Sequence, residues 1–113
     1  MAYTPERGDI VHLEFDPSAG HEMKGQHFGL VVSSKAFNHT GFALICPISQ
    51  GAAARNFGMI VTLMGSGTNT QGAVHCHQVK SLDWKVRRVK LRETAPQHVV
   101  DEVLARLEAI LLE

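Results

Sequence analysis

The sequence of 113 residues has few cysteines, few aromatic residues and no net charge. Cys46 and Cys76 are too few for a disulfide scaffold, and the N-terminus lacks the apolar core of a secretory signal. We therefore expect reduced thiols and a cytoplasmic location. No apolar run approaches the roughly 20 residues that span a bilayer, so we expect no membrane segment. Hydrophobic residues at 44% exclude a disordered chain, and the length suits one domain, 1–113.

Charge is distributed unevenly along the chain, although eleven basic residues balance eleven acidic ones. The segment 80–92 contains six cations and one acid, whereas the tail 93–113 contains five acids and one arginine. Such a basic segment can attract phosphate groups locally in a protein of zero net charge. The alternative is a solvated strand edge, which lysine and arginine protect against pairing with another chain.

Short apolar runs between turn residues predict a mainly β protein. We expect strands at 10–15, 30–33, 42–48, 59–63, 72–79 and 86–91. Between the first two, residues 18–29 show no periodicity, which predicts a long loop, and long loops in compact domains are often functional. This loop contains His21, Glu22, Lys24 and His27.

The C-terminal segment is predicted to form a helix. Thr94 is a suitable N-cap, Pro96 suits the first turn, and Gln97 occupies the capping-box position. Apolar residues then recur on one stripe: Val99, Val100, Val103, Leu104, Leu107, Ile110 and Leu111. Short strands followed by one terminal helix predict a small, strongly bent sheet or barrel that the helix caps.

Sequence blocks typical of one protein family occur in order along nearly the whole chain. They are 7–11, 15–22, 31–33, 36–38, 46–51 and 78–81, followed by the late helix. The block from Asp16-Pro17 to His21-Glu22 is the most specific of them. In these blocks the chain resembles the MazF/PemK (Kid, ChpB) toxins of bacterial type II toxin–antitoxin systems.

The resemblance implies a fold, an activity and partners. The fold would be the small SH3-like barrel of the CcdB/Kid/MazF toxin type. The protein would be a homodimeric endoribonuclease that cleaves single-stranded mRNA selectively by 2′-OH attack, leaving a 2′,3′-cyclic phosphate. It would need no cofactor or metal. A cognate antitoxin of the MazE or PemI kind would neutralise it through an acidic C-terminal segment.

Histidine replaces the family's charged catalytic residues at three positions. The family usually has an Arg-Pro pair where this chain has His27-Phe28, and the PemK-like branch has an arginine and an aspartate where this chain has His75 and His77. Histidine populates both protonation states near neutral pH, so it can act as the base for the 2′-OH and as the acid for the leaving 5′-oxygen. On a strand, both histidines would project from one face, and Cys76 would point to the core.

The candidate site follows from the resemblance and this chemistry. The candidate catalytic residues are His21, His27, Ser49, His75 and His77. Ser49 lies where the family has threonine or serine, and its hydroxyl is suited to bind a phosphate oxygen. Arg55 is suited to hold phosphate by bidentate hydrogen bonds. The candidate substrate-binding residues are Glu22, Lys24, Gln50, Arg55, Phe57, Gln78 and Lys80.

Three other interpretations remain open from the sequence. The two strand histidines, with His21 or Glu22, could bind zinc, which takes three protein ligands in catalytic sites. The chain could be a non-cleaving toxin that binds a protein target such as gyrase, although its only tryptophan, Trp84, is not near the C-terminus as in CcdB-like poisons. It could also be a degenerate family member that binds an antitoxin but has lost cleavage.

Overall fold

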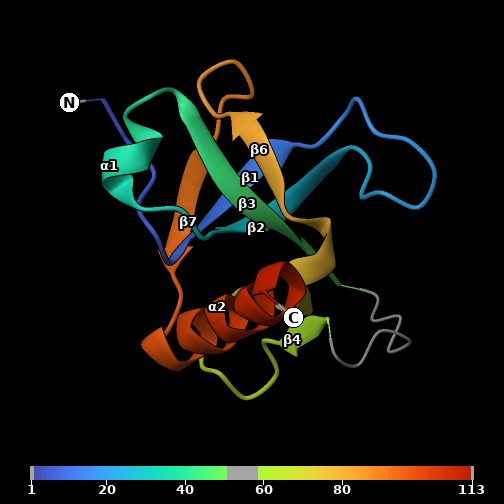
Figure 1. Cartoon of the computed structure of the whole chain (residues 1–113). Coiled ribbons are helices and arrows are strands. Elements are labelled where there is room, and N and C mark those ends of the chain that lie inside the picture. The colour runs from blue at the N-terminus through green and yellow to red at the C-terminus, as the bar shows by residue number, and fades with distance from the viewer. Residues whose placement is uncertain (1, 51–58, 113) are drawn as a thin grey trace.

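A computed structural model describes residues 2–50 and 59–112 of the chain. The described part contains strands, two α-helices and one short 3-10 helix (Figure 1). The elements in chain order are β1 (Asp9–Glu14), β2 (Gln26–Val31), α1 (Lys35–Asn38), β3 (Phe42–Ser49), β4 (Ile60–Thr62), β5 (Ala73–His75), η1 (Cys76–Gln78), β6 (Lys80–Asp83), β7 (Lys90–Thr94) and α2 (Gln97–Leu112). The prediction of a mainly β protein with a C-terminal helix is confirmed.

The seven described strands form one antiparallel sheet that bends around β3. The strand order is β4-β5-β3-β2-β1-β7, and β6 also pairs with β3. The start of β3 pairs with β6, from Phe42 to Ile45, while its end pairs with β5 through Ile48 and Ser49. Because two strands share β3 in this way, the sheet divides beside the end of β3, and η1 connects the two partners.

Two clusters of apolar side chains form the core, one on each face of the sheet. The first lies under α2, which crosses that face in Figure 1. It contains Ile10, Leu30, Cys46, Ile48, Val74 and the buried stripe of α2: Val99, Val100, Val103 and Leu107. The second fills the bend of the sheet and contains Val11, Leu13, Phe15, Val31, Ala43, Ile45, Leu82 and Trp84. Within the described ranges, no helix is long and apolar enough to cross a membrane.

The start of α2 differs from the sequence prediction. Thr94 pairs with Asp9 as the last residue of β7, so it is not the helix cap. The helix begins at Gln97, and the carbonyl of Pro96 accepts the N–H groups of Val99 and Val100. The ladder with β1 fixes the backbone of Thr94 in an extended conformation, which a local capping pattern cannot override.

Several predicted boundaries differ from the structure, among them those of one strand and of the long loop. The predicted strand 86–91 begins only at Lys90, because residues before it form the turn after β6. The predicted loop 18–29 ends earlier than expected, since β2 begins at Gln26, and His27 therefore lies on a strand.

Candidate active site

His27, Ser49 and His75 lie on the same face of the sheet, on three neighbouring strands. Their sequence neighbours pair across β2, β3 and β5 and pack in the core under α2: Phe28, Ile48 and Val74. Because side chains alternate along a strand, the three candidate residues belong to the opposite face. This is the face of the second core cluster, and Leu13 of that cluster pairs with His27.

Gly72 allows β5 to approach the end of β3. Gly72 has a φ of 111°, a conformation that residues other than glycine rarely adopt. A Cβ added at Gly72 would lie 2.2 Å from the carbonyl oxygen of Ser49. The position of Ser49 beside Ala73, its partner on β5, therefore depends on the absence of a side chain at residue 72.

His75 and His77 lie close together, but not on one strand as the sequence predicted. β5 ends at His75, and Cys76–Gln78 forms the 3-10 helix η1, so His77 is not on the strand. The expectation that both project from one strand face is therefore wrong. The turn nevertheless brings the rings together, with centroids 5.6 Å apart and planes inclined by 42°. Cys76 points into the core as expected, and burial raises the pKa of its thiol to about 11.

His75 is held in an environment that favours its neutral form. The residue is only 8% exposed. Burial lowers its pKa, and the charge of a protonated His77 lowers it further. The Nδ1 atoms of both rings are buried without a hydrogen-bond partner among the described residues. A neutral imidazole with an unpaired ring nitrogen is chemically able to accept a proton at neutral pH.

The β1–β2 loop is fastened beside the histidine pair. The backbone N–H of Met23 donates to Oε1 of Gln78 on η1 at 2.7 Å. Nζ of Lys80 on β6 lies 3.4 Å from Oε1 of Glu22. The N–H of Ala19 and the Lys80 ammonium hold the pKa of the Glu22 carboxyl below its usual value. His21 directly precedes Glu22 on this fastened part of the loop, and its side chain is exposed.

The remaining predicted residues lie in different surroundings. Lys24 on the loop and Gln50 after β3 are exposed. Arg55 and Phe57 lie outside the described residues. The only tryptophan of the sequence, Trp84, is buried in the second core cluster, where its Nε1 donates to the carbonyl of Asn38 at 2.7 Å.

Among the described residues, the structure gives the histidine pair no third ligand for zinc. In the part of the chain that the structure describes, no group of three His, Cys, Asp or Glu side chains could hold a metal ion. The loop tip is fastened by Glu22 itself, whose carboxylate is engaged by Lys80. The histidine pair therefore offers two nitrogens, one fewer than the three protein ligands of a catalytic zinc site.

Arg87 is a structural residue of the site that the sequence pattern did not single out. Its Nη1 donates to the carbonyl of Glu14 at 2.8 Å and to that of Asp16 at 2.7 Å, where the β1–β2 loop begins. One guanidinium thus fixes the start of the loop, while Gln78 and Lys80 hold its tip. The sequence signal was the basic segment 80–92, but that pattern does not distinguish a cation that binds backbone carbonyls from one that faces solvent.

These features describe a small bent-sheet protein with a pair of histidines beside the end of β3. A model of the "PemK-like, MazF-like toxin of type II toxin-antitoxin system" family matches residues 6–111. The chain belongs to this family. The resemblance noted in the sequence is thereby confirmed.

Curated relatives and solved structures agree with this assignment. The chain is 41% identical to endoribonuclease PemK of Escherichia coli over 94% of this chain and 81% of that protein. It is 42% identical to endoribonuclease toxin ChpB of E. coli strain K12, over 94% and 93% respectively. The crystal structure of MazF from Deinococcus radiodurans matches with a TM-score of 0.89 and 36% identity, covering 97% of this chain and 98% of that one. A MazE-MazF structure from the same organism matches with a TM-score of 0.82 and 36% identity, covering 97% of each chain. The predicted toxin-type barrel fold is thus confirmed.

Proposed function

We propose that this protein is the toxin of its pair and an endoribonuclease that cleaves single-stranded mRNA without a metal. The names of its relatives PemK and ChpB, both endoribonucleases, support this function. The reaction would be attack of a ribose 2′-OH on the adjacent phosphorus with loss of the 5′-oxygen, which gives a 2′,3′-cyclic phosphate. Such a step needs a base, an acid and stabilisation of the phosphorane charge.

The observation that carries this proposal is the pairing of His75 with His77. The lowered pKa of His75 keeps it neutral near pH 7, which suits a general base. His77, half-buried on η1, can act as the general acid that donates a proton to the leaving 5′-oxygen. Ser49 and His27, on the same face as His75, would bind the phosphate oxygens. His21, on the fastened loop, is the remaining candidate for proton transfer.

The substrate-binding roles rest on residues around this face. Lys80 and Gln78 hold the loop tip, and a phosphate oxygen can replace the Glu22 carboxylate as the partner of Lys80. Such an exchange replaces one charge-assisted contact of Lys80 by another and needs no rearrangement of β6. Exposed Lys24 and Gln50 are free to reach the RNA on either side. Arg55 and Phe57 stay predictions for phosphate and base contacts.

Partners and location follow from the same proposal. The MazE-MazF structures of the relatives support a cognate antitoxin, whose acidic segment would compete with RNA for the cations of 80–92. A homodimer is supported by apolar side chains that remain exposed at the end of α2: Ile110, Leu111 and Leu112. A monomer by sedimentation at micromolar concentration would contradict it. The proposed location is the cytoplasm, where mRNA and antitoxin are found.

The decisive experiment is a gel assay of the purified protein on a long RNA in the presence of EDTA. We expect cleavage products with 2′,3′-cyclic ends and a bell-shaped pH profile. His75→Ala or His77→Ala should lower the rate about 10² to 10⁴-fold if that residue transfers a proton. Ser49→Ala should cost less, about 1–3 kcal/mol, as one hydrogen bond to phosphate. His27→Arg, which restores the family residue, should keep or raise the rate.

The same assay distinguishes the other interpretations. No cleavage by a protein that still binds its antitoxin tightly would identify a degenerate family member. No cleavage together with binding to gyrase would identify a protein-directed poison. Activity that EDTA abolishes and zinc restores would make the histidines metal ligands.

A further inference from the structure

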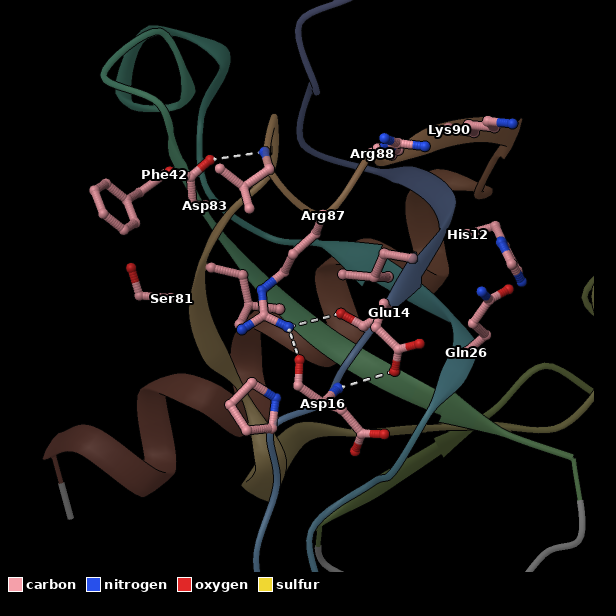
Figure 2. A pocket seen from close by; sticks show the side chains of 14 residues that line it. His12, Glu14, Asp16, Gln26, Phe42, Ser81, Asp83, Arg87, Arg88 and Lys90 are labelled. Carbon is pink, nitrogen blue, oxygen red and sulfur yellow. Dashed lines mark hydrogen bonds between the residues drawn. The ribbon is translucent and has the colours of Figure 1, made fainter.

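A hollow of about 890 Å³ lies where β7 stops pairing with β1 (Figure 2). The β1–β7 ladder ends at the pair of His12 with Lys90, so the outer edge of β1 beyond His12 has no partner among the described strands. Arg87 bridges part of this gap through its two carbonyl hydrogen bonds. Side chains of β1, β2, β6 and the β6–β7 turn line the remainder. The hollow is as large as a typical small-ligand site.

Two cations at one edge of the hollow have no side-chain partner among the described residues. Arg88 and Lys90 are exposed, lie next to each other in Figure 2, and form no side-chain ion pair or hydrogen bond with any described residue. The acids of the hollow are oriented elsewhere. Asp83 accepts backbone N–H groups of its own turn, Glu14 accepts the backbone N–H two residues on, and Asp16 accepts a serine hydroxyl. The positive charge at this edge is therefore available to an anionic ligand.

Planar groups continue from the hollow along the sheet. The ring of His12 meets that of Phe28 edge to face, with centroids 5.3 Å apart. The guanidinium of Arg92 lies over the Phe28 ring, 4.6 Å from its centroid. His12 pairs with both Phe28 and Lys90, so these side chains share one face. A cationic edge beside stacked planar groups is the combination that binds single-stranded nucleic acid.

We propose that this hollow binds the flank of an RNA substrate, with Arg88 and Lys90 on its phosphates and the half-buried ring of His12 or the exposed guanidinium of Arg92 against a base. The inference rests on the proposed function, since it takes RNA as the substrate. An acidic peptide would be attracted by the two cations alone and would gain nothing from the planar groups. The structure therefore favours RNA as the occupant.

The hollow is connected to the candidate active site through the β1–β2 loop. Both ends of the loop, Glu14 and Asp16 on one side and Gln26 on the other, line the hollow. The tip of the same loop contacts Gln78 and Lys80 beside the histidine pair. RNA leaving the active site can thus follow the loop to the hollow, so that contacts there would raise affinity without taking part in the cleavage step.

The test is equilibrium binding by the full chain of fluorescein-labelled, 2′-O-methyl single-stranded RNA, which lacks the nucleophile and cannot be cut. A mixed-sequence oligonucleotide of about 20 nucleotides reaches beyond the active site, and one of about 5 nucleotides does not. The test variant is Arg88→Gly combined with Lys90→Gln. Glycine is chosen because Arg88 has a φ of 53°, which glycine adopts without strain, so folding is not impaired. Lys35→Gln is the control, since Lys35 is an exposed lysine on α1, outside the segment 80–92, and does not line the hollow.

We expect the double variant to bind the long RNA about threefold more weakly for each lost phosphate contact. The slope of log affinity against log salt should fall by about 0.7 per contact, while affinity for the short RNA stays unchanged. Unchanged affinity for the long RNA, or an equal loss in Lys35→Gln, would overturn the proposal. A loss of affinity for an acidic antitoxin peptide, with the affinity for RNA unchanged, would also overturn the proposal.

Cleavage of ordinary RNA by the unmodified protein is measured in parallel. Cleavage with no effect of Arg88 or Lys90 on RNA binding would overturn this inference and leave the proposed function intact. RNA binding that depends on Arg88 and Lys90, without any cleavage, would support this inference and contradict the proposed function. Absence of any RNA binding would overturn both.

Discussion

His75 and His77 lie with ring centroids 5.6 Å apart, and the Nδ1 atom of each is buried without a hydrogen-bond partner among the described residues. Protonation of one ring therefore opposes protonation of the other. Burial adds to this effect at His75, whose pKa is lowered. The pair is therefore suited to carry one proton rather than two, with one ring neutral and the other protonated, which is the state that acid–base catalysis requires.

The lowered pKa of His75 should make the protein less stable in mild acid. The unfolded chain binds a proton at His75 near pH 6.5, whereas the folded protein binds it only at lower pH. The free energy of unfolding should therefore fall as the pH drops below about 6.5 and be fully restored above it. His75→Gln should reduce this fall, as measured by urea denaturation at about pH 7.5 and about pH 5.5. His98→Gln, at an exposed position on α2, is the control, and an equal pH dependence in wild type and His75→Gln would contradict the argument.

Removal of the Gln78 side chain should release the loop tip without unfolding the protein. Gln78→Ala eliminates the acceptor of the Met23 N–H, a loss of about 0.5–1.5 kcal/mol. Amide exchange at Met23 should become faster, and RNA cleavage should slow by about twofold to tenfold because His21 is less well positioned. Gln97→Ala is a matched control, since it removes a glutamine hydrogen bond to Asp101 on α2. Unchanged exchange at Met23 would show that Gln78 does not hold the loop.

Gly72 should tolerate no side chain. Gly72→Ala combines a φ of 111° with a Cβ only 2.2 Å from the Ser49 carbonyl, so we expect a loss of about 2–4 kcal/mol in unfolding free energy. Gly65→Ala separates the two causes, because Gly65 also has a positive φ but nothing lies within 4 Å of its added Cβ. That variant should lose about 1 kcal/mol. Equal losses in thermal or urea denaturation would mean that the contact with Ser49 is unimportant.

Arg88→Gly should stabilise the protein. Arg88 is the one described residue other than glycine with a positive φ, 53°, a conformation that costs an L-residue about 1–2 kcal/mol. The substitution removes this cost, but the greater freedom of glycine in the unfolded chain offsets part of the benefit. We therefore expect the free energy of unfolding to rise by about 1 kcal/mol. Lys85→Gly on the same turn, where φ is not positive, should instead lower stability. A loss in both variants, measured by urea denaturation, would contradict the argument.

Much of the fold could be predicted from local sequence pattern. The apolar stripe of α2 is buried at Val99, Val100, Val103 and Leu107, because helical spacing alone decides which residues share a face. The stripe ends early, however, since Ile110 and Leu111 are exposed. Strand boundaries were less well predicted, because a ladder partner distant in sequence decides them, as Asp9 does for Thr94.

The site could be predicted only in part, for a similar reason. Residue identity indicated histidine chemistry at His75 and His77, and the structure brings their rings together. The reason given for that proximity, a common strand, was wrong, because β3 pairs with two successive strands and the chain must turn between them at η1. The roles of all these residues in cleavage stay predictions.

The sequence by itself determined the family, the mainly β class, the terminal helix and the chemical types of the candidate residues, since these depend on local pattern and on motifs along the chain. Only the tertiary structure decided which of these residues meet. It placed His27 on a strand beside Ser49, and assigned Arg87 to two backbone carbonyls rather than to solvent. Strand register and loop contacts join residues that are far apart in sequence, and their energies depend on the folded arrangement, which no local pattern contains.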